Sequence, residues 1–269
     1  MRVAKNVRRY GSAPYTVAVI HGGPGASGEM APVARVLAPR WGVVEPMQTA
    51  TSLEGQIEEL KALLEEHADP PVALIGYSWG AWLSYLLAAQ HPALVSKLIL
   101  VGSGPYTTAY AARITEARLS RLDEGERAEM TSILERLGDS AAADVSAAFA
   151  RLGALAAKTD AYDPVDEPEA PEEGETLPKV DWADAAKVLA EAQALRASGE
   201  LLELGKHIRC PVVAIHGADD PHPAEGVRGP LSGVLTDFSF FLLERCGHKP
   251  WVERQAREEF YRILEAALC

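Results

Sequence analysis

Residues 72–90 read VALIGYSWGAWLSYLLAAQ and fall into three parts. The first part, residues 72–75, is a short apolar run that predicts a buried strand. The last part, residues 81–90, is apolar on almost every side, which predicts a helix at the centre of a fold. Between them, Gly76-Tyr77-Ser78-Trp79-Gly80 fits the pattern G-x-S-x-G. In that pattern a sharp strand-to-helix turn lifts a serine hydroxyl clear of the sheet.

Ser78 is the predicted nucleophile of this turn. The helix that follows places its positive end near the hydroxyl. The glycines two residues to either side relieve the backbone crowding that a sharp turn causes. The alternative is a tight turn in which Ser78 only caps the helix. The position between a strand and a buried helix favours the nucleophile.

Short apolar runs and helical patterns alternate through both ends of the chain. Thr51 and Glu54 form a predicted capping box, followed by apolar residues at helical spacing from Leu53. A last helix is predicted to start at Pro250, since proline suits a first helical turn. The predicted strands are residues 16–20, 42–45, 72–75, 97–101, 211–215 and 238–243. This order predicts an α/β fold with a mostly parallel sheet and helices on both faces.

The middle of the chain interrupts this pattern. Residues 103–207 contain Ala-rich helical stretches and no convincing strand. They are predicted to form a helical cap inserted between the two parts of one sheet domain, residues 1–102 and 208–269. Within the insertion, residues 160–181 carry many carboxylates and several prolines, which break helices. We expect a solvated loop there.

The motif His21-Gly22-Gly23-Pro24-Gly25 follows the first strong strand. Its glycines let backbone N–H groups approach a substrate closely, and an acyl-transfer enzyme needs two such donors for the developing oxyanion. We assign these donors to Gly23 and to Trp79, the residue after the serine. We also expect the Gly23–Pro24 peptide to be cis or tightly turned. The alternative is a flexible loop without a part in the chemistry.

A nucleophilic serine needs a base, and the base needs an orienting carboxylate. His248 is the best-placed histidine, because it lies between the last predicted strand and the final helix. Asp220 is the predicted carboxylate, in the turn after residues 211–215, and its neighbour Asp219 is the alternative. We expect His21, His216 and His222 to pack beside the site and to supply supporting hydrogen bonds. We expect His67, His91 and His207 at the surface or at helix ends.

Composition narrows the choice of partners. The chain has 269 residues and a net charge of −12, which repels nucleic acid and anionic lipid, so neither nucleic acid nor a membrane is expected as a partner. Cys210, Cys246 and Cys269 are far apart and form no zinc-binding set. The N-terminal residues contain no apolar run of the signal-peptide kind. These features predict a cytoplasmic protein that uses no metal and no cofactor.

The motifs HGGPG, GYSWG, HGADDP and GHKPW occur in the order found in the α/β-hydrolase family. The chain resembles that family over about residues 10–102 and 208–268. The resemblance implies an α/β-hydrolase fold under a helical cap, with Ser78, Asp220 and His248 as a triad. Within the family, HGGPG and a nucleophile followed by tryptophan resemble the proline iminopeptidases, which remove an N-terminal proline. In such enzymes the residues that match Gly23 and Trp79 supply the oxyanion hole.

The predicted function is a serine hydrolase acting on a small-molecule or short-peptide substrate with an amide or ester bond. If the resemblance to the peptidases extends to specificity, carboxylates within residues 160–181 would hold the substrate's protonated amine. Alternatives with the same triad are a carboxylesterase or lactonase and a carbon–carbon bond hydrolase. Another alternative is a non-catalytic ligand-binding protein on the same scaffold. A dehalogenase or an epoxide hydrolase would need an aspartate in place of Ser78.

Overall fold

A computed structural model describes residues 6–138, 145–165, 177–178 and 181–269. Its core is a 7-stranded sheet with the strand order β1-β3-β2-β4-β5-β6-β7. Only β1 runs antiparallel to its neighbour. The strands are β1 (Val7–Tyr10), β2 (Tyr15–Ile20), β3 (Gly42–Pro46), β4 (Val72–Tyr77), β5 (Val95–Val101), β6 (Val212–Gly217) and β7 (Phe238–Leu243). The prediction of a mostly parallel α/β sheet is therefore confirmed.

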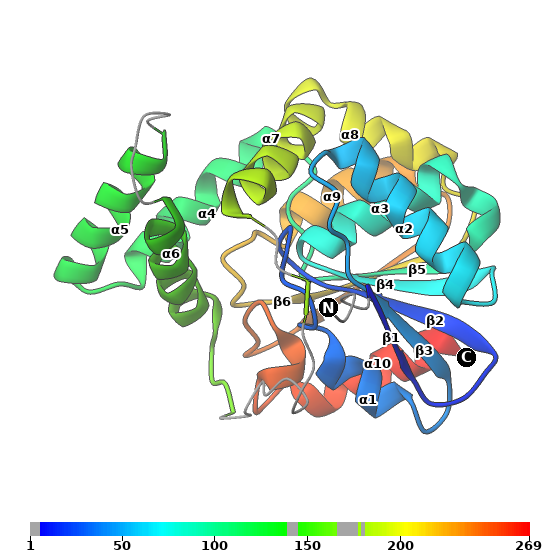
Figure 1. The fold of residues 1–269 in the computed structure, drawn as a ribbon. Helices are drawn as coiled ribbons and strands as arrows, with labels where there is room; N and C mark the ends of the chain where they lie inside the picture. The colour runs from blue at the N-terminus through cyan, green and yellow to red at the C-terminus, as the bar shows by residue number, and fades with distance from the viewer. Residues whose placement is uncertain (1–5, 139–144, 166–176, 179–180) are drawn as a thin grey trace.

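Helices cover both faces of this sheet (Figure 1). On one face lie α1 (Ala31–Leu37) and α10 (Arg257–Leu268), and on the other lie α2 (Leu53–His67), α3 (Trp79–Gln90) and α9 (Glu225–Val234). Side chains alternate between the two faces along each strand. In β5, Leu98 and Leu100 pack toward α3, whereas Ile99 and Val101 pack toward α1 and α10. Because both faces are covered, the central strands are mostly apolar.

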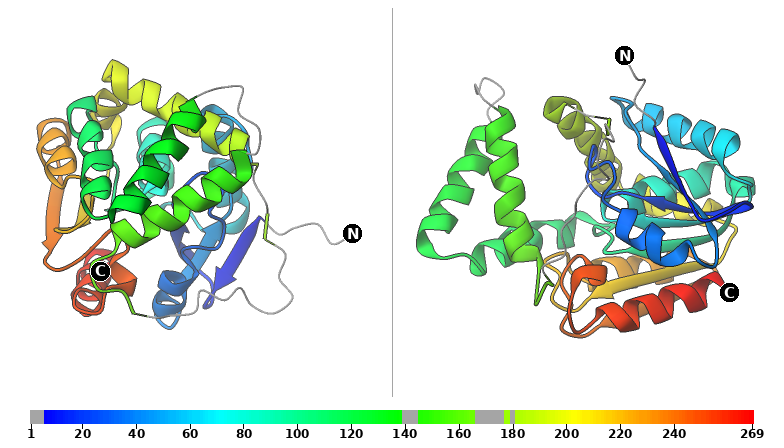
Figure 2. Two further views of the ribbon diagram at one scale, coloured as in Figure 1. Left: turned by 90° about the vertical axis from the view of Figure 1, so that its left-hand side faces the viewer. Right: turned by 60° about the horizontal axis from the view of Figure 1, so that its bottom comes forward.

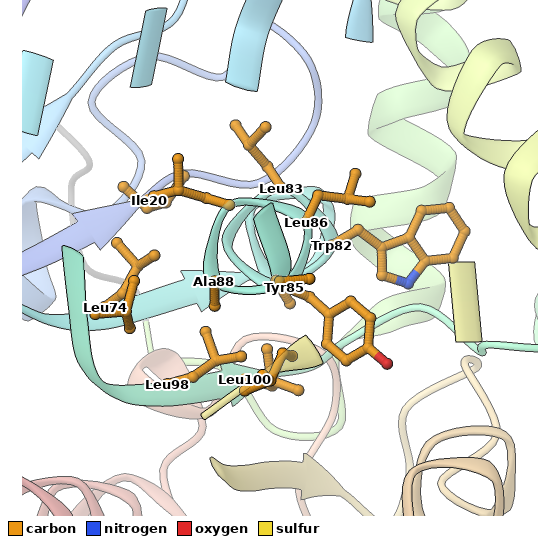
Figure 3. Close-up of a cluster of buried hydrophobic side chains, with 14 of the residues drawn as sticks. Ile20, Leu74, Trp82, Leu83, Tyr85, Leu86, Ala88, Leu98 and Leu100 are labelled. Carbon is orange, nitrogen blue, oxygen red and sulfur yellow. The ribbon is translucent and has the colours of Figure 1, made fainter. Parts of the chain in front are cut away.

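Helix α3 is the centre of the larger apolar core. All of its residues from Trp79 to Ala89 are buried. Figure 3 shows its side chains packed beside Ile20 of β2, Leu74 of β4 and Leu98 of β5. The predicted central helix is therefore present, and it holds the turn at Ser78 against three neighbouring strands.

Between β5 and β6 the described residues form helices and no strand. These inserted helices are α4 (Thr108–Ser120), α5 (Glu124–Gly138), α6 (Val145–Asp160), α7 (Trp182–Ser198) and α8 (Glu200–Glu203). α5 and α6 share a small apolar cluster of their own, and Figure 2 shows them standing away from the sheet. In contrast, α7 buries Val188 and Ala192 in the main core.

Several local predictions need correction. Ser52, not Thr51, caps α2, and its Oγ accepts a hydrogen bond from Gly55 N–H at 3.1 Å. Pro250 opens a short 3-10 turn, and the final helix starts only at Arg257. Of the predicted acidic loop, Asp160 is the last residue of α6, and residues 166–176 and 179–180 lie outside the described residues. No helix in the described parts of the chain is long and apolar enough to cross a membrane.

Candidate active site

The turn after β4 holds Ser78 in a strained backbone conformation, with φ of 53° and ψ of −113°. Residues other than glycine rarely adopt positive φ, so surrounding contacts must enforce it. A Cβ atom on Gly76 would overlap the backbone of Gly80, and one on Gly80 would overlap the carbonyl of Ile20. The two glycines of the motif are therefore required by the close approach of β4, α3 and β2. Ser78 N–H also donates to the carbonyl of Val101 at 2.9 Å.

His248 lies in the loop after β7 and contacts Ser78 beyond the carboxyl ends of the strands. Its Nε2 is 2.9 Å from Ser78 Oγ, and its Nδ1 is 2.7 Å from Asp220 Oδ2. A neutral imidazole that donates from Nδ1 to this carboxylate leaves Nε2 to accept from the hydroxyl. The structure thus brings the three predicted residues into one hydrogen-bonded chain.

Asp220, and not the alternative Asp219, faces His248. Asp220 is buried, and its Oδ1 accepts from the backbone N–H of His222 at 2.8 Å. The Nδ1 atom of the same histidine is also 2.8 Å from Oδ1. His216 Nε2 lies 3.4 Å from Oδ2. Three histidines therefore surround one carboxylate. His222 supports it through hydrogen bonds, as the sequence predicts, whereas His216 Nε2 is hydrogen-bonded to the His222 carbonyl at 2.7 Å.

These contacts decide the protonation state of Asp220, His248 and His222. Burial raises the pKa of Asp220, but the facing histidines, His248 first, lower it by more, so its pKa lies well below the ordinary value. Burial lowers the pKa of His248, but the Asp220 carboxylate outweighs that effect and the net shift is upward. For His222 burial dominates and lowers the pKa to about 4. At neutral pH, Asp220 is thus an anion and His222 is neutral.

The neutral ring of His222 also covers the ring of His248. Their centroids are 4.3 Å apart and the two planes are inclined by 22°. On another side, the ring of Tyr77 lies 5.0 Å from His248. The imidazole of His248 is therefore held by ring contacts as well as by its two hydrogen bonds.

Gly23 and Trp79, the predicted oxyanion donors, line one cavity together with Ser78. Gly23 has φ of +44° and begins a tight turn that Ala26 N–H closes on the Gly23 carbonyl at 3.1 Å. The Gly23–Pro24 peptide is trans, so the predicted cis form is wrong and the predicted tight turn is present. Trp79 is the first residue of α3, where a backbone N–H has no acceptor within the helix.

Two cavities meet at Ser78 and share Gly23 and Arg118. The first has a volume of about 350 Å³ and the second about 440 Å³. The α4/α7 pocket is the first, and its other lining residues include Trp82, Pro105, Ile114, Thr115, Leu189, Gln193, Arg196 and His222. The α6 pocket is the second, lined further by Glu29, Tyr77, Ala157, Asp160, His248, Lys249 and Glu253. A substrate group on either side of a bond cleaved at Ser78 therefore has a separate cavity to enter.

Arg118 and Asp160 tie two inserted helices together beside His248. The guanidinium of Arg118 donates from Nε and Nη2 to the two carboxylate oxygens of Asp160 at 2.8 and 2.6 Å. This bidentate geometry is the strong form of an arginine–carboxylate pair. The Asp160 carbonyl also accepts from His248 N–H at 2.7 Å. The end of α6 is thus joined both to α4 and to the loop that carries the histidine.

The other two acids of the α6 pocket also have partners. Glu29 lies 2.7 Å from the ammonium group of Lys249 and accepts from Gly22 N–H at 3.0 Å. Glu253 is fully buried. Its carboxylate accepts from the backbone N–H groups of Tyr162, Asp163 and Gly247 at 2.9, 2.8 and 3.0 Å. These acids therefore hold loops in place, and each of their charges is compensated.

One group of side chains has the composition of a metal site. Ligand atoms of Asp160, His222 and His248 lie within 4.8 Å of one another, and this is the one such group in the described residues. Asp160 is already paired with Arg118, and His248 is already bonded to Ser78. A cation would have to displace these contacts, so the group belongs to the hydrogen-bonded network around Ser78.

Sequence patterns do not single out Arg118 or Arg196 as site residues. A weak signal is present, because Ile114 and Arg118 are four residues apart on α4. Leu189 and Arg196 are similarly two turns apart on α7. Such spacing shows that residues share one helix face, but it does not show what that face covers.

Comparison with known proteins addresses the fold. No curated protein sequence matches the chain. The solved structure of VinJ is similar with a TM-score of 0.69 at 17% identity, over 97% of this chain and 93% of that one. Proline iminopeptidase from Mycobacterium smegmatis has a TM-score of 0.64 at 16% identity, over 97% of this chain and 93% of that one. The thioesterase domain from the curacin biosynthetic pathway has a TM-score of 0.64 at 18% identity, over 97% of this chain and 94% of that domain.

The family assignment rests on a match along the sequence. A model described as alpha/beta hydrolase family matches residues 17–263. This span includes the strands from β3 to β7 and the hydrogen-bonded residues Ser78, Asp220 and His248. The chain belongs to the alpha/beta hydrolase family.

Proposed function

We propose that this protein is a serine hydrolase that cleaves an ester or amide bond through an acyl-enzyme on Ser78. The observation that supports this most is the unbroken hydrogen-bonded chain from Ser78 Oγ through His248 to Asp220. It lies where two cavities meet, so a bound carbonyl has access to the hydroxyl. The strained φ of Ser78 adds support, because backbone strain of this kind clusters at active sites.

The reaction follows from the roles of these groups. Ser78 Oγ attacks the carbonyl carbon while His248 Nε2 accepts its proton, and Asp220 stabilises the resulting imidazolium. Backbone N–H groups of Gly23 and Trp79 stabilise the oxyanion. The imidazolium then gives its proton to the leaving oxygen or nitrogen, and that group departs. Water, deprotonated by His248, cleaves the acyl ester and restores the serine.

A second candidate is an aminopeptidase of the proline iminopeptidase kind. Asp160, the first acid of the segment 160–181, lines the α6 pocket beside His248, where it could face a substrate ammonium group. In the described residues, however, Asp160 is paired with Arg118, and Glu29 and Glu253 have partners as well. A hydrolase that needs no free amine, such as a carboxylesterase or lactonase, therefore has the better support. The experiments below distinguish this hydrolase from two further alternatives, a carbon–carbon bond hydrolase and a ligand-binding protein on the same scaffold.

A fluorophosphonate probe tests the nucleophile. We expect it to label the wild-type protein and not the Ser78→Ala variant, because the probe reacts with an activated serine. Ser232→Ala is the matched control, since Ser232 is exposed on α9 and its Oγ donates only to the Arg228 carbonyl. Absence of labelling in the folded wild-type protein would contradict the proposal and favour a ligand-binding protein.

A substrate panel tests the specificity. We expect turnover of short-chain aryl esters, and similar rates on prolyl or alanyl arylamides with a free and with an N-acetylated amine. A preference of about tenfold or more for the free amine, the size of one charge-assisted contact, would establish the aminopeptidase instead. Cleavage of a β-diketone with no ester hydrolysis would favour the carbon–carbon bond hydrolase.

A further inference from the structure

Two helix faces form the walls of the α4/α7 pocket. Helix α4 contributes Ile114 and Thr115, and helix α7 contributes Leu189, Gln193 and Arg196. On α7 these residues follow the spacing i, i+4, i+7, so they share one face. The walls thus combine the apolar side chains of Ile114 and Leu189 with polar ones, and Arg196 adds a guanidinium group.

Trp82 connects this guanidinium to the nucleophile. Trp82 lies on α3 one helical turn after Ser78, and the Arg196 guanidinium carbon is 5.3 Å from the centroid of its ring. The indole N–H donates to the Gly104 carbonyl at 3.1 Å, which fixes the ring. In Figure 3 the indole points away from the strand residues Leu74 and Leu98 and toward the inserted helices. Arg196 therefore lies against the ring of Trp82 in the cavity that Ser78 also lines.

Arg196 differs from Arg118, the other arginine of the pocket, in its partners. Arg118 is engaged by both oxygens of Asp160. Arg196 makes no ion pair with any described residue, and its Nε is buried without an acceptor. Burial lowers the pKa of Arg196, but a guanidinium still stays charged at neutral pH. A buried donor without an acceptor is costly, and a bound ligand would supply the missing acceptor.

We propose that the substrate of this hydrolase carries a carboxylate, which Arg196 binds in the α4/α7 pocket. The inference rests on the proposed function, because it assigns a substrate class to the cavity beside Ser78. An apolar chain between the carboxylate and the scissile carbonyl packs against Trp82 and Leu189. A single guanidinium matches one carboxylate, whereas a phosphate dianion needs more positive charge and Arg118 is already neutralised by Asp160.

Paired esters test this proposal. For the acyl side the pair is mono-4-nitrophenyl glutarate and its methyl ester, with spontaneous hydrolysis subtracted. We expect kcat/KM to be at least about tenfold higher for the acid, which corresponds to about 1.4 kcal/mol. Arg196→Gln should lower the acid-to-methyl-ester ratio by at least about tenfold, and Arg196→Lys should restore part of it. Arg209→Gln is the matched control, because Arg209 is exposed and lines neither cavity.

A second pair places the carboxylate on the leaving group. It consists of the butyrate esters of 4-hydroxybenzoate and of methyl 4-hydroxybenzoate. The two phenols differ in reactivity as leaving groups, so their rates are not compared directly. Instead, the ratio of kcat/KM for the acid to kcat/KM for the neutral ester is taken in the wild-type protein and divided by the same ratio in Arg196→Gln. A quotient of at least about tenfold in one pair assigns the pocket to that side of the bond. A quotient near one in both pairs overturns the proposal.

Binding gives a measurement that does not require turnover. In the Ser78→Ala variant we expect monobenzyl glutarate to bind at least about tenfold more tightly than benzyl methyl glutarate by calorimetry. Arg196→Gln in the same background should remove the difference. Equal affinities in a protein that the fluorophosphonate labels would refute the carboxylate site and leave the hydrolase intact. Absent labelling, together with this affinity difference, would refute the hydrolase and leave the carboxylate site.

Discussion

Helices α3 and α4 both line the cavity at Ser78, yet they are packed very differently. α3 is buried from Trp79 to Ala89, whereas no residue of α4 is buried. Close packing fixes side chains within small distances, which suits the groups that must hold a reacting carbonyl. A lightly packed helix can change its exposed face at little cost in stability. The sheet and α3 therefore fix the side chains around Ser78, whereas the exposed face of α4 can vary.

The polar groups show the same contrast. Around Asp220, the buried carboxylate accepts hydrogen bonds from His222 N–H and is in contact with three imidazoles. In the α4/α7 pocket, the buried Nε of Arg196 has no acceptor. A satisfied network rigidifies a site, whereas an unsatisfied donor that lines a cavity is free to bind a ligand acceptor. The four predictions that follow are designed to break or refine this contrast.

The largest effect is expected from Asp220→Asn. Loss of the anion removes the group that orients His248 and stabilises its charged form, which is worth about 10⁴ in kcat in a well-characterised triad. Asp219→Asn is the matched control and should change kcat by less than about threefold, because it is no partner of His248. Both rates are measured on a short-chain aryl ester, with circular dichroism to check folding. If Asp219→Asn were the more damaging change, the assignment of the carboxylate would be wrong.

The packing contrast predicts a difference in stability. Leu83→Ala on α3 deletes a fully buried side chain, so the free energy of unfolding should fall by about 2–5 kcal/mol. Leu189→Ala on α7 deletes a partly buried one from the pocket wall, so we expect a loss of less than about 1.5 kcal/mol. Urea denaturation measures both values. Equal losses would show that the inserted helix is as tightly packed as the core.

A smaller effect is expected from His222→Phe. The phenyl ring keeps the stacking on His248 but loses the contact between Nδ1 and Asp220 Oδ1, while the backbone N–H at this position still donates. A hydrogen bond to a charged group is worth about 1.5–3 kcal/mol, so kcat should fall by roughly tenfold or more. Because the role is to position other groups, KM should be almost unchanged. A large rise in KM with normal kcat would instead make His222 a substrate contact.

The pH dependence of kcat/KM tests the electrostatics directly. His248 must be neutral to act as a base, and Asp220 raises its pKa, so activity should fall as pH decreases through a pKa above the ordinary histidine value. In Asp220→Asn the main effect that raises the pKa of His248 is lost, so burial should dominate and the acid limb should move to lower pH. For stability the sign is opposite, since the ion pair stabilises the fold while Asp220 is ionised and His248 is charged, and it weakens as pH rises through the raised pKa of His248. An acid limb that stays in place in the variant would contradict this account.

Much of the fold and the centre of the site are predictable from local patterns. The pattern G-x-S-x-G places Ser78, because steric overlap around Gly76 and Gly80 leaves no choice at those positions. His248 and Asp220 follow from the order of strands, because parallel strands bring their carboxyl ends to one edge. The capping residue is harder to predict, since Thr51 and Ser52 are chemically alike and only Ser52 reaches Gly55 N–H.

Elements with weak local patterns are not predictable in the same way. The edge strand β1 has only 4 residues and pairs antiparallel with β3, so it depends on a partner far along the chain. Helix α6 ends at Asp160, at the start of a segment whose charge and prolines predict a loop. The roles of Asp160 and Arg118 follow from the meeting of α6 with α4, which no local periodicity encodes.

The order of turns and apolar runs in the sequence is enough to define the parallel strands, the strained serine turn and the chain order of Ser78, Asp220 and His248. These features depend on local sterics and on side-chain periodicity, which act over a few residues. The partners of charged groups are decided only by the tertiary structure. Arg118 is neutralised and Arg196 is not, although both are arginines on helices of one insertion. That difference arises because electrostatic interactions fall off with distance in space, and the packing of the helices sets that distance.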